Sequence, residues 1–250
     1  MAQKARTQSA DPPPARRGAQ KSKAGPNAGK TDAAAATRAE ILATPTREFS
    51  EKGLSGARVD EIAVRTQINK RMIYYYFGSK EGLYSAVLER CYGHIRMSEA
   101  AMQLDSLAPT EALRQLVRHT FDYHSMHPDF VRLVMNENIH QGSYIGDLAS
   151  IKTRSRNVLG NLRALLDRGI AAAVFRADIQ PVELHMSISA LCFYNVSNRY
   201  TFSRIFDHDM TSPKAVAARR ETVVDMILRW CAADPGKMEA PKAQRSRSSR

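Results

Sequence analysis

Between residues 37 and 234, apolar side chains recur almost everywhere with the three-to-four-residue spacing of amphipathic helices. No segment alternates apolar and polar residues for long enough to predict a strand. The pattern therefore predicts an all-α protein of about nine helices, with an N-terminal three-helix unit followed by a helical bundle.

Glycine and proline residues divide this pattern into separate helices. Prolines 109, 128, 181 and 213 fit first turns, where the missing N–H has no partner to lose. Ser79 is predicted to cap a long fourth helix, Gly142–Gly146 to form a loop, and Gly169 to mark a kink or a close helix crossing. The predicted helices are one ending at Gly53, Arg58–Arg65, Asn69–Tyr75, one starting after Ser79, Pro109–Met126, Pro128–His140, Asp147–Val174, Pro181–Phe206 and Pro213–Ala232.

The second and third predicted helices flank Thr66-Gln67-Ile68 with helix-turn-helix spacing. The third helix opens with an amide and two cations, at Asn69, Lys70 and Arg71, and continues into four aromatic residues. Amide, cationic and phenol groups suit base edges and phosphates.

A short helix cannot bury four successive aromatic rings on one face. Tyr74 or Tyr75 is therefore expected to point outward, whereas Tyr76 and Phe77 are predicted to be core. The alternative is an aromatic run that only clasps the core, beside cations that only form a solvated surface.

The runs F-S-E-K-G at 49–53 and Y-Y-Y-F-G-S-K-E at 74–81, with V-D-E-I-A at 59–63 between them, resemble the DNA-binding domain of TetR-type (TetR/AcrR) transcriptional regulators. The resemblance implies that the third helix enters the major groove of a palindromic operator. It also implies that Tyr74 and Lys80 hold the DNA backbone. The DNA-binding residues implied in this way are Arg58, Asn69, Lys70, Arg71, Met72, Tyr74, Tyr75 and Lys80.

Three positions depart from the family pattern. Pro45 stands inside the first helix, so the helix either kinks there or restarts with Thr44 as its N-cap. Gln67 replaces a common turn glycine, which costs about 1 kcal/mol if that residue adopts a positive φ. Arg71 and Met72 replace a smaller pair and make the reading surface larger and more cationic.

One helix-turn-helix unit reads only a few base pairs, so a homodimer is expected. The last two helices are predicted to form its interface, although the same faces fit an intramolecular core. The predicted interface residues are Ile188, Leu191, Cys192, Val196, Arg199, Val223, Ile227, Leu228 and Trp230.

A small-molecule effector pocket is predicted where polar groups interrupt the apolar faces of the middle helices. In TetR-type regulators, ligand binding there typically releases DNA, so the resemblance implies a repressor with an effector. Ordinary core or surface positions remain the alternative for each residue. The candidate pocket residues are His94, Met97, His119, Tyr123, Asn138, His185 and Ser189.

The net charge of +12 is concentrated at the two ends of the chain. Residues 1–36 carry seven basic and two acidic groups, and residues 235–250 carry five basic groups and one acidic group. Both segments are predicted to be disordered, as a basic arm and a basic tail around a DNA-binding domain (37–82) and an effector and dimerisation domain (83–234). Such arms either raise affinity for nucleic acid by counterion release or are simply solvated.

Several other classes of protein are disfavoured. No apolar segment has the length of a signal core or a membrane span, which predicts a cytoplasmic protein. Cys91, Cys192 and Cys231 are too far apart for a zinc knuckle or a disulfide framework, and His124-x-x-His127 has no further ligand at a convincing spacing, so no metal is predicted. No catalytic motif is found, so neither an enzyme nor a cofactor is expected. The alternatives are a sequence-tolerant architectural DNA-binding protein and a helical ligand-binding protein or enzyme with a vestigial helix-turn-helix.

Overall fold

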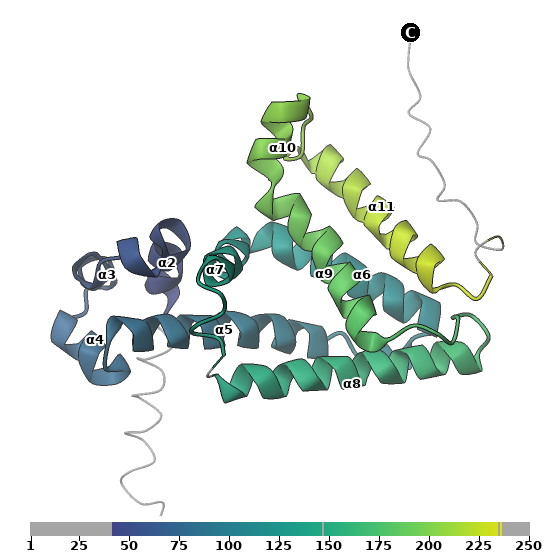
Figure 1. Cartoon of the computed structure of the whole chain (residues 1–250), viewed down its shortest axis with the longest axis horizontal. Coiled ribbons are helices and arrows are strands. Elements are labelled where there is room, and N and C mark those ends of the chain that lie inside the picture. The colour runs from purple at the N-terminus through teal and green to yellow at the C-terminus, as the bar shows by residue number, and fades with distance from the viewer. Residues whose placement is uncertain (1–41, 147, 235, 237–250) are drawn as a thin grey trace, which may run out of the picture. The chain divides into compact units, whose positions relative to one another are not determined.

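The computed structural model describes residues 42–146, 148–234 and 236 (Figure 1). These residues form ten α-helices and one 3-10 turn, and their β structure is limited to an isolated bridge between Phe175 and Ala232. The prediction of an all-α protein is confirmed. The predicted arm at 1–36 and most of the predicted tail at 235–250 lie outside the described residues.

The helix bounds follow the predicted ones closely. The main difference is that Asn198 divides the predicted Pro181–Phe206 helix into α9 and α10, which raises the number of helices from nine to ten in the described part of the chain. The elements are α2 (Ala43–Gly56), α3 (Val59–Thr66), α4 (Lys70–Phe77), α5 (Lys80–Ala100), η1 (Leu104–Ser106), α6 (Pro109–Met126), α7 (Pro128–Ile139), α8 (Ala149–Ala171), α9 (Pro181–Ser197), α10 (Arg199–Phe206) and α11 (Pro213–Cys231).

Helix α2 accommodates Pro45 in its first turn, where the absent N–H costs no intrahelical bond. Its N-cap is Leu42 and not Thr44, and the Thr46 hydroxyl donates to the Leu42 carbonyl at 2.7 Å. Gly53 takes φ +66°, so the regular helix ends there as predicted, and one further turn leads toward α3.

Side-chain caps and one left-handed residue set the path from α3 to α5. Gln67 adopts φ +55°, which confirms that the turn requires the left-handed region. The Asn69 side chain accepts from the Arg71 N–H at 2.8 Å and starts α4. The Ser79 hydroxyl accepts from the Gly82 N–H at 3.0 Å and starts α5, which confirms the predicted cap.

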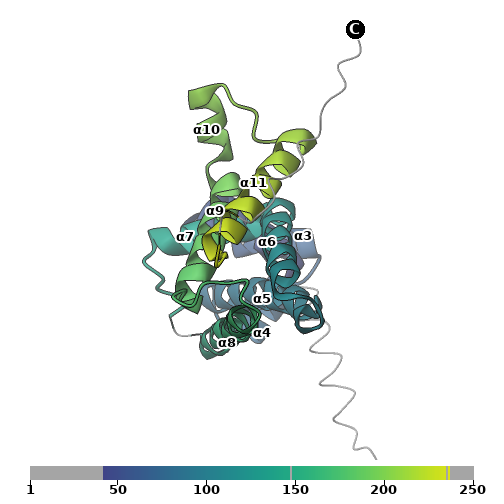
Figure 2. The ribbon, with the colours of Figure 1, turned by 90° about the vertical axis from the view of Figure 1, so that its right-hand side faces the viewer.

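Two large clusters of buried apolar residues lie at the two ends of α5. Helices α2, α3 and α4 close around Phe49, Ile62 and Ile73 with the first turns of α5. Helices α6, α8, α9 and α11 form the second core (Figure 1). Figure 2, turned by 90°, looks along α5 and α8 and shows α6, α9 and α11 on the same side of both.

Gly169 does not kink α8, and its nearest neighbour is an aromatic ring of the following loop. The helix continues to Ala171, and the ring of Phe175 folds back onto Gly169 from the loop that follows. The glycine is needed because a Cβ built there lies 1.9 Å from Phe175 Cδ2.

No helix in the described part of the chain has both the length and the hydropathy of a membrane span.

Candidate DNA-binding surface and ligand cavity

Helix α4 exposes the side of the helix-turn-helix that carries the predicted DNA-binding groups. Tyr75 is 77% exposed, and Met72 and Tyr74 are exposed by 40% and 39%. Asn69, Lys70, Arg71 and Arg58 are also exposed, whereas Lys80 is half-buried. Seven of the eight predicted residues therefore face outward together on α4 and the segments beside it.

The aromatic run divides between core and surface as its helical spacing requires. Phe77 is buried, and Tyr76 is half-buried against the N-terminal core. Tyr74 and Tyr75 are both exposed, which confirms that a short helix cannot bury the whole run.

The three cations of this surface differ in their partners. Lys70 Nζ lies 2.7 Å from Asp60 Oδ1 of α3, and this contact raises the pKa of Lys70. Lys80 Nζ donates to the Ser55 carbonyl at 3.2 Å. The Arg71 guanidinium has no hydrogen bond or ion pair within the described residues, so it is available to a ligand without breaking an internal contact.

A buried carboxylate fixes α3 onto α2. Glu48 is fully buried, and its two oxygens lie 2.8 Å from Lys52 Nζ and 3.3 Å from Arg65 Nη1. Lys52 also contacts Glu61 of α3, and this contact lowers the pKa of Glu61. A buried charge persists when it is paired in this way, so the lysine of the F-S-E-K-G run positions α3 and, through the turn, α4.

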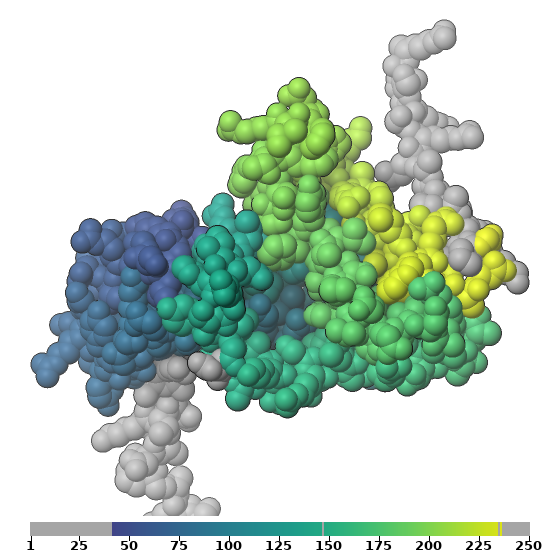
Figure 3. All heavy atoms as spheres, in the orientation of Figure 1, coloured from purple at the N-terminus to yellow at the C-terminus, as the bar shows by residue number. Residues whose placement is uncertain are grey.

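A cavity of about 770 Å³ lies in the bundle between α5, α6, α7, α8 and α9. Figure 3 shows the surface hollowed between α7 and α9. The volume of the cavity is in the usual range for small-molecule sites. The apolar wall includes Ile95, Leu116, Phe130, Val134, Leu162, Leu165, Ile188 and Phe193, and the polar wall includes Arg96, Glu99, His124, Arg154, Arg156, Asn157, Asn161, Arg168, His185 and Ser189.

His124 is the most deeply buried titratable side chain in the cavity wall, at 5% exposure. Its Nδ1 has no hydrogen-bond partner. Burial, with a contribution from Arg96, lowers the pKa of His124 to about 4, and burial also lowers the pKa of His185. Both imidazoles are therefore neutral at pH 7, and the positive charge of the wall comes from arginine.

The structure places two of the seven predicted pocket residues in the cavity wall. His185 and Ser189 line the cavity, but the other predicted residues do not. Tyr123 is buried and its hydroxyl is 2.9 Å from His94 Nδ1, while His119 Nε2 is 3.0 Å from the Ser98 hydroxyl. Met97 and Asn138 are exposed to solvent, because their positions on α5 and α7 face away from the bundle.

Sequence reasoning missed the polar wall contributed by α8. Arg154, Arg156, Asn157 and Asn161 stand in a strongly polar stretch, which is also the pattern of a solvated helix face. Only the packing of α8 against α5 and α9 shows that part of this face borders a cavity.

Most residues predicted for the dimer interface lie in the core of the single chain. Ile188, Cys192, Val223, Ile227 and Leu228 are all buried in the core of the single chain, and Val196 is 5% exposed. Leu191, Arg199 and Trp230 are half-buried. Most of the predicted set thus fills the intramolecular core, which was the alternative reading of these faces.

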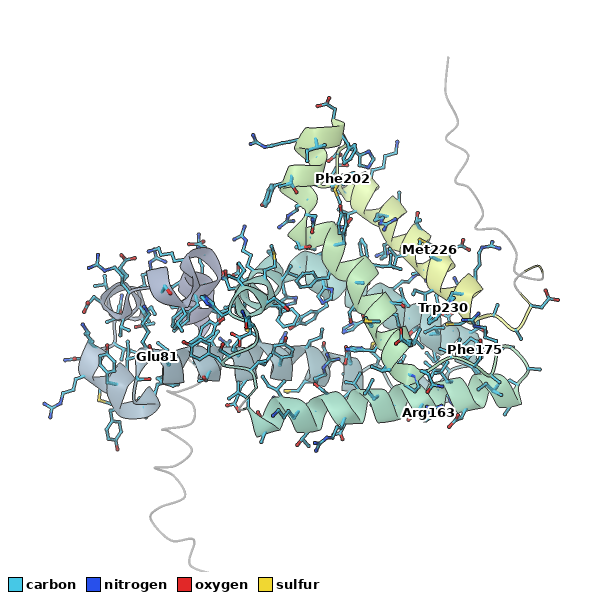
Figure 4. The ribbon with its side chains drawn as sticks, viewed as in Figure 1. Glu81, Arg163, Phe175, Phe202, Met226 and Trp230 are labelled. Atoms are coloured by element: carbon cyan, nitrogen blue, oxygen red, sulfur yellow. The ribbon has the colours of Figure 1, made fainter. Side chains whose placement is uncertain are left out.

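The outer faces of the same helices carry a different apolar set. Val182, Met186 and Tyr194 are exposed at four- and eight-residue spacing on α9, and Met226 is exposed on α11 (Figure 4). Residues four apart share one face of a helix, so the α9 side chains form a stripe.

Among the described residues, no group of three histidine, cysteine or acidic side chains is arranged to hold a metal ion. His124 and His127 both lie against the Tyr123 ring, and His124 also lies against Phe130. Pro128 starts α7 directly after His127.

A helix-turn-helix with an outward cationic face, joined to a helical bundle, is the architecture of a DNA-binding regulator. The model of the bacterial regulatory proteins of the tetR family matches residues 41–87, and the tetracyclin repressor-like C-terminal domain matches residues 109–227. The chain belongs to the tetR family of bacterial regulatory proteins.

Individual relatives agree with this assignment. The chain is 37% identical over 193 residues to the HTH-type transcriptional repressor NicS of Pseudomonas putida, covering 77% of this chain and 91% of NicS. It is 32% identical over 108 residues to the repressor SCO4008 of Streptomyces coelicolor, covering 43% and 53% of the two chains. A crystal structure of the regulator SCO4942 from the same organism superposes with a TM-score of 0.58 at 26% identity, covering 76% and 96% of the two chains.

Proposed function

We propose that this protein is a transcriptional repressor that binds a palindromic operator as a homodimer and is released by a small-molecule effector. The observation that carries the proposal is the set of exposed side chains on α4 and its N-cap, namely Asn69, Lys70, Arg71, Met72, Tyr74 and Tyr75. Residues 37–82 are assigned to DNA binding and 83–234 to dimerisation and effector binding. Because its partner would be chromosomal DNA, the protein is assigned to the cytoplasm. The word repressor rests on the likeness to NicS and SCO4008.

The side chains of α4 divide into two roles in this proposal. Arg71 has no internal partner and a forked guanidinium, which suits guanine edges in the major groove. Lys70, Tyr74 and Lys80 supply an ammonium, a phenol and a second ammonium to the phosphates, which fix the orientation of the helix. Met72 and Tyr75 add exposed apolar surface for contact with thymine methyl groups.

Dimerisation is assigned to the outer faces of α9 and α11. Val182, Met186, Tyr194 and Met226 would pack against the same residues of a second copy in a four-helix arrangement. Exposed apolar side chains at helical spacing are typical of such an interface. A twofold axis there would present two α4 helices to two half-sites of the operator.

Effector binding reaches the DNA-binding domain through α7 in this proposal. Phe130 and Val134 of α7 line the cavity, and Asn136 Nδ2 on the same helix donates to the Phe49 carbonyl of α2 at 3.2 Å. A ligand that shifts α7 therefore acts directly on α2. The ligand releases DNA if it binds the released arrangement more tightly than the DNA-bound one.

The test is DNA binding by matched variants on a fragment selected from genomic DNA. Arg71→Ala should weaken binding to that fragment by about 1–3 kcal/mol and change binding to random duplex much less, because it removes a base contact. Arg163→Ala removes an exposed arginine of α8 and should change neither affinity. An equal loss on both duplexes for Arg71→Ala would favour a sequence-tolerant architectural protein, and no loss would indicate a vestigial helix-turn-helix.

A further inference from the structure

The cavity in the bundle combines an apolar interior with polar groups of one prevailing charge. Leu116, Phe130, Leu162 and Phe193 form its wall together with other aliphatic side chains of α5 and α9. Burial of a ligand's apolar surface against such a wall contributes about 25 cal/mol per Å². The body of a bound molecule is therefore apolar.

Two of the four arginines in the wall are already bound by other groups of the chain. Arg96 Nη1 contacts both oxygens of Glu99, at 2.8 and 2.6 Å. Arg168 donates to the carbonyls of Leu104, Asp105 and Leu107, at 2.8 to 3.0 Å. These two cations hold the wall together, and Glu99 is neutralised within it.

The other two arginines of the wall are available to a ligand. Arg154 and Arg156 are exposed on α8, at the rim of the cavity. Arg154 makes one hydrogen bond, at 3.3 Å to the Glu89 carbonyl, and Arg156 has no partner within the described residues. The remaining carboxylate, Asp105, lies on η1 beside Arg168, whose guanidinium donates to its carbonyl. The rim formed by α8 is therefore cationic.

A buried side chain in the cavity wall provides a second, independent observation that points to a ligand. His124 is 5% exposed, and its Nδ1 lacks any hydrogen-bond partner. Leaving a buried polar atom unpaired costs about 1–3 kcal/mol, so the site gains when a ligand supplies the missing bond.

We propose that the effector is an organic monoanion with an apolar body, whose carboxylate lies at the α8 rim that carries Arg154 and Arg156 and whose body carries a hydrogen-bonding group that reaches His124. This inference rests on the proposed function in one respect, namely that the cavity is the effector site. The orientation follows from the chemistry, because the charged end stays at the solvated rim and the apolar end fills the wall.

Three probes with the same ring system and different head groups test the charge of the ligand. Binding of 2-naphthoate, 2-naphthylmethanol and 2-naphthylmethylamine to the full chain is measured by titration calorimetry without DNA. The carboxylate is expected to bind at least about tenfold more tightly than the amine, the equivalent of about 1.4 kcal/mol. Equal affinities for the three probes, or no binding by any of them, would overturn the proposal.

Matched variants of α8 test the two rim arginines. The Arg154→Gln, Arg156→Gln double variant should lose the preference for the carboxylate, about tenfold, while its affinity for the alcohol stays the same. Arg163→Gln removes one arginine charge from an exposed position of α8 outside the cavity wall, where its guanidinium is 3.4 Å from Gln180 Oε1 (Figure 4). It should keep the preference. If Arg163→Gln lost the preference as the double variant does, the preference would come from the overall charge of the protein and not from the rim, which would contradict the proposal.

Hydroxylated 2-naphthoates test the role of His124. At least one positional isomer should bind more tightly than 2-naphthoate, and His124→Phe and His124→Leu, which carry no hydrogen-bonding group, should both remove this advantage without affecting 2-naphthoate itself. The contrary result is that no isomer binds more tightly, or that the advantage survives in both variants. Binding of the anion without release of the operator would contradict the proposed function alone. Operator binding by a protein that does not bind the anion would contradict this inference alone.

Discussion

Substituting Gly169 by alanine places a small group where the structure has no space. The Cβ would lie 1.9, 2.5 and 2.6 Å from three ring carbons of Phe175, far inside van der Waals contact. The ring is 4% exposed, and the backbone cannot carry it away: the N–H groups of Val174 and Phe175 both donate to the Gly169 carbonyl, and that of Arg176 donates to the Cys231 carbonyl. Figure 4 shows Phe175 beside the end of α8. The ring must therefore leave its site or strain its surroundings.

The magnitude follows from two opposing effects. Overpacking a core costs about 1–3 kcal/mol, and losing a buried phenyl group entirely costs about 3–5 kcal/mol, so the clash amounts to roughly 3 kcal/mol. Alanine in place of glycine in a helix restores about 1 kcal/mol. Gly169→Ala is expected to destabilise the protein by about 2 kcal/mol, since the clash exceeds the gain in helix propensity.

Gly160 of the same helix provides a matched control, because a Cβ built there meets no atom within 4 Å. Gly160→Ala should stabilise the protein by up to about 1 kcal/mol. Urea unfolding followed by far-UV circular dichroism, at one protein concentration, measures both variants. Adding Phe175→Leu to Gly169→Ala should recover part of the loss. The reasoning is refuted if Gly169→Ala is as stable as Gly160→Ala.

Three further outcomes are expected. Asp60→Asn releases Lys70 from its 2.7 Å contact, so it should tighten binding to every duplex and steepen the dependence of log K on log salt; unchanged affinity in filter binding would contradict this. Lys80→Ala should weaken binding to specific and random duplexes alike and reduce the slope of log K against log salt by about one. An unaltered slope would show that Lys80 does not contact a phosphate. Because burial lowers the pKa of His124 to about 4, below its unfolded value, the unfolded chain binds a proton first as the pH falls below about 6.5. The contribution of the neutral histidine to stability is therefore full above that pH and is lost between about pH 6.5 and pH 4. Between pH 7 and pH 5, the free energy of unfolding of His124→Gln should fall by about 2 kcal/mol less than that of the wild type. Equal losses in urea unfolding would contradict a neutral buried histidine.

The helices were predictable because their signals are local. Ser79 and the prolines at 109, 128, 181 and 213 are recognised from their neighbours in the sequence, and each begins a helix close to the expected position. The break at Asn198 was missed because the apolar residues continue on both sides of it, through Val196 and Phe202.

The outward face of α4 was predictable for the same reason, whereas the cavity and the exposed face of α9 depend on packing. The period of a helix shows that Ile188 and Met186 lie on different faces, but only the neighbours decide which face is buried inside the chain. His94 and Met97 were expected in the pocket from their polarity and spacing. The packing of α5 turns both of them toward solvent and turns Arg96 and Glu99 toward the cavity.

Hydroxyl-radical footprinting of the full chain on a fragment selected from genomic DNA tests the central claim, that two α4 helices read one operator. Two protected regions related by a twofold axis are expected, about 34–36 Å or a multiple of that distance apart, with two chains bound per fragment. A single protected half-site with one chain bound, or uniform protection of any duplex, would contradict the account.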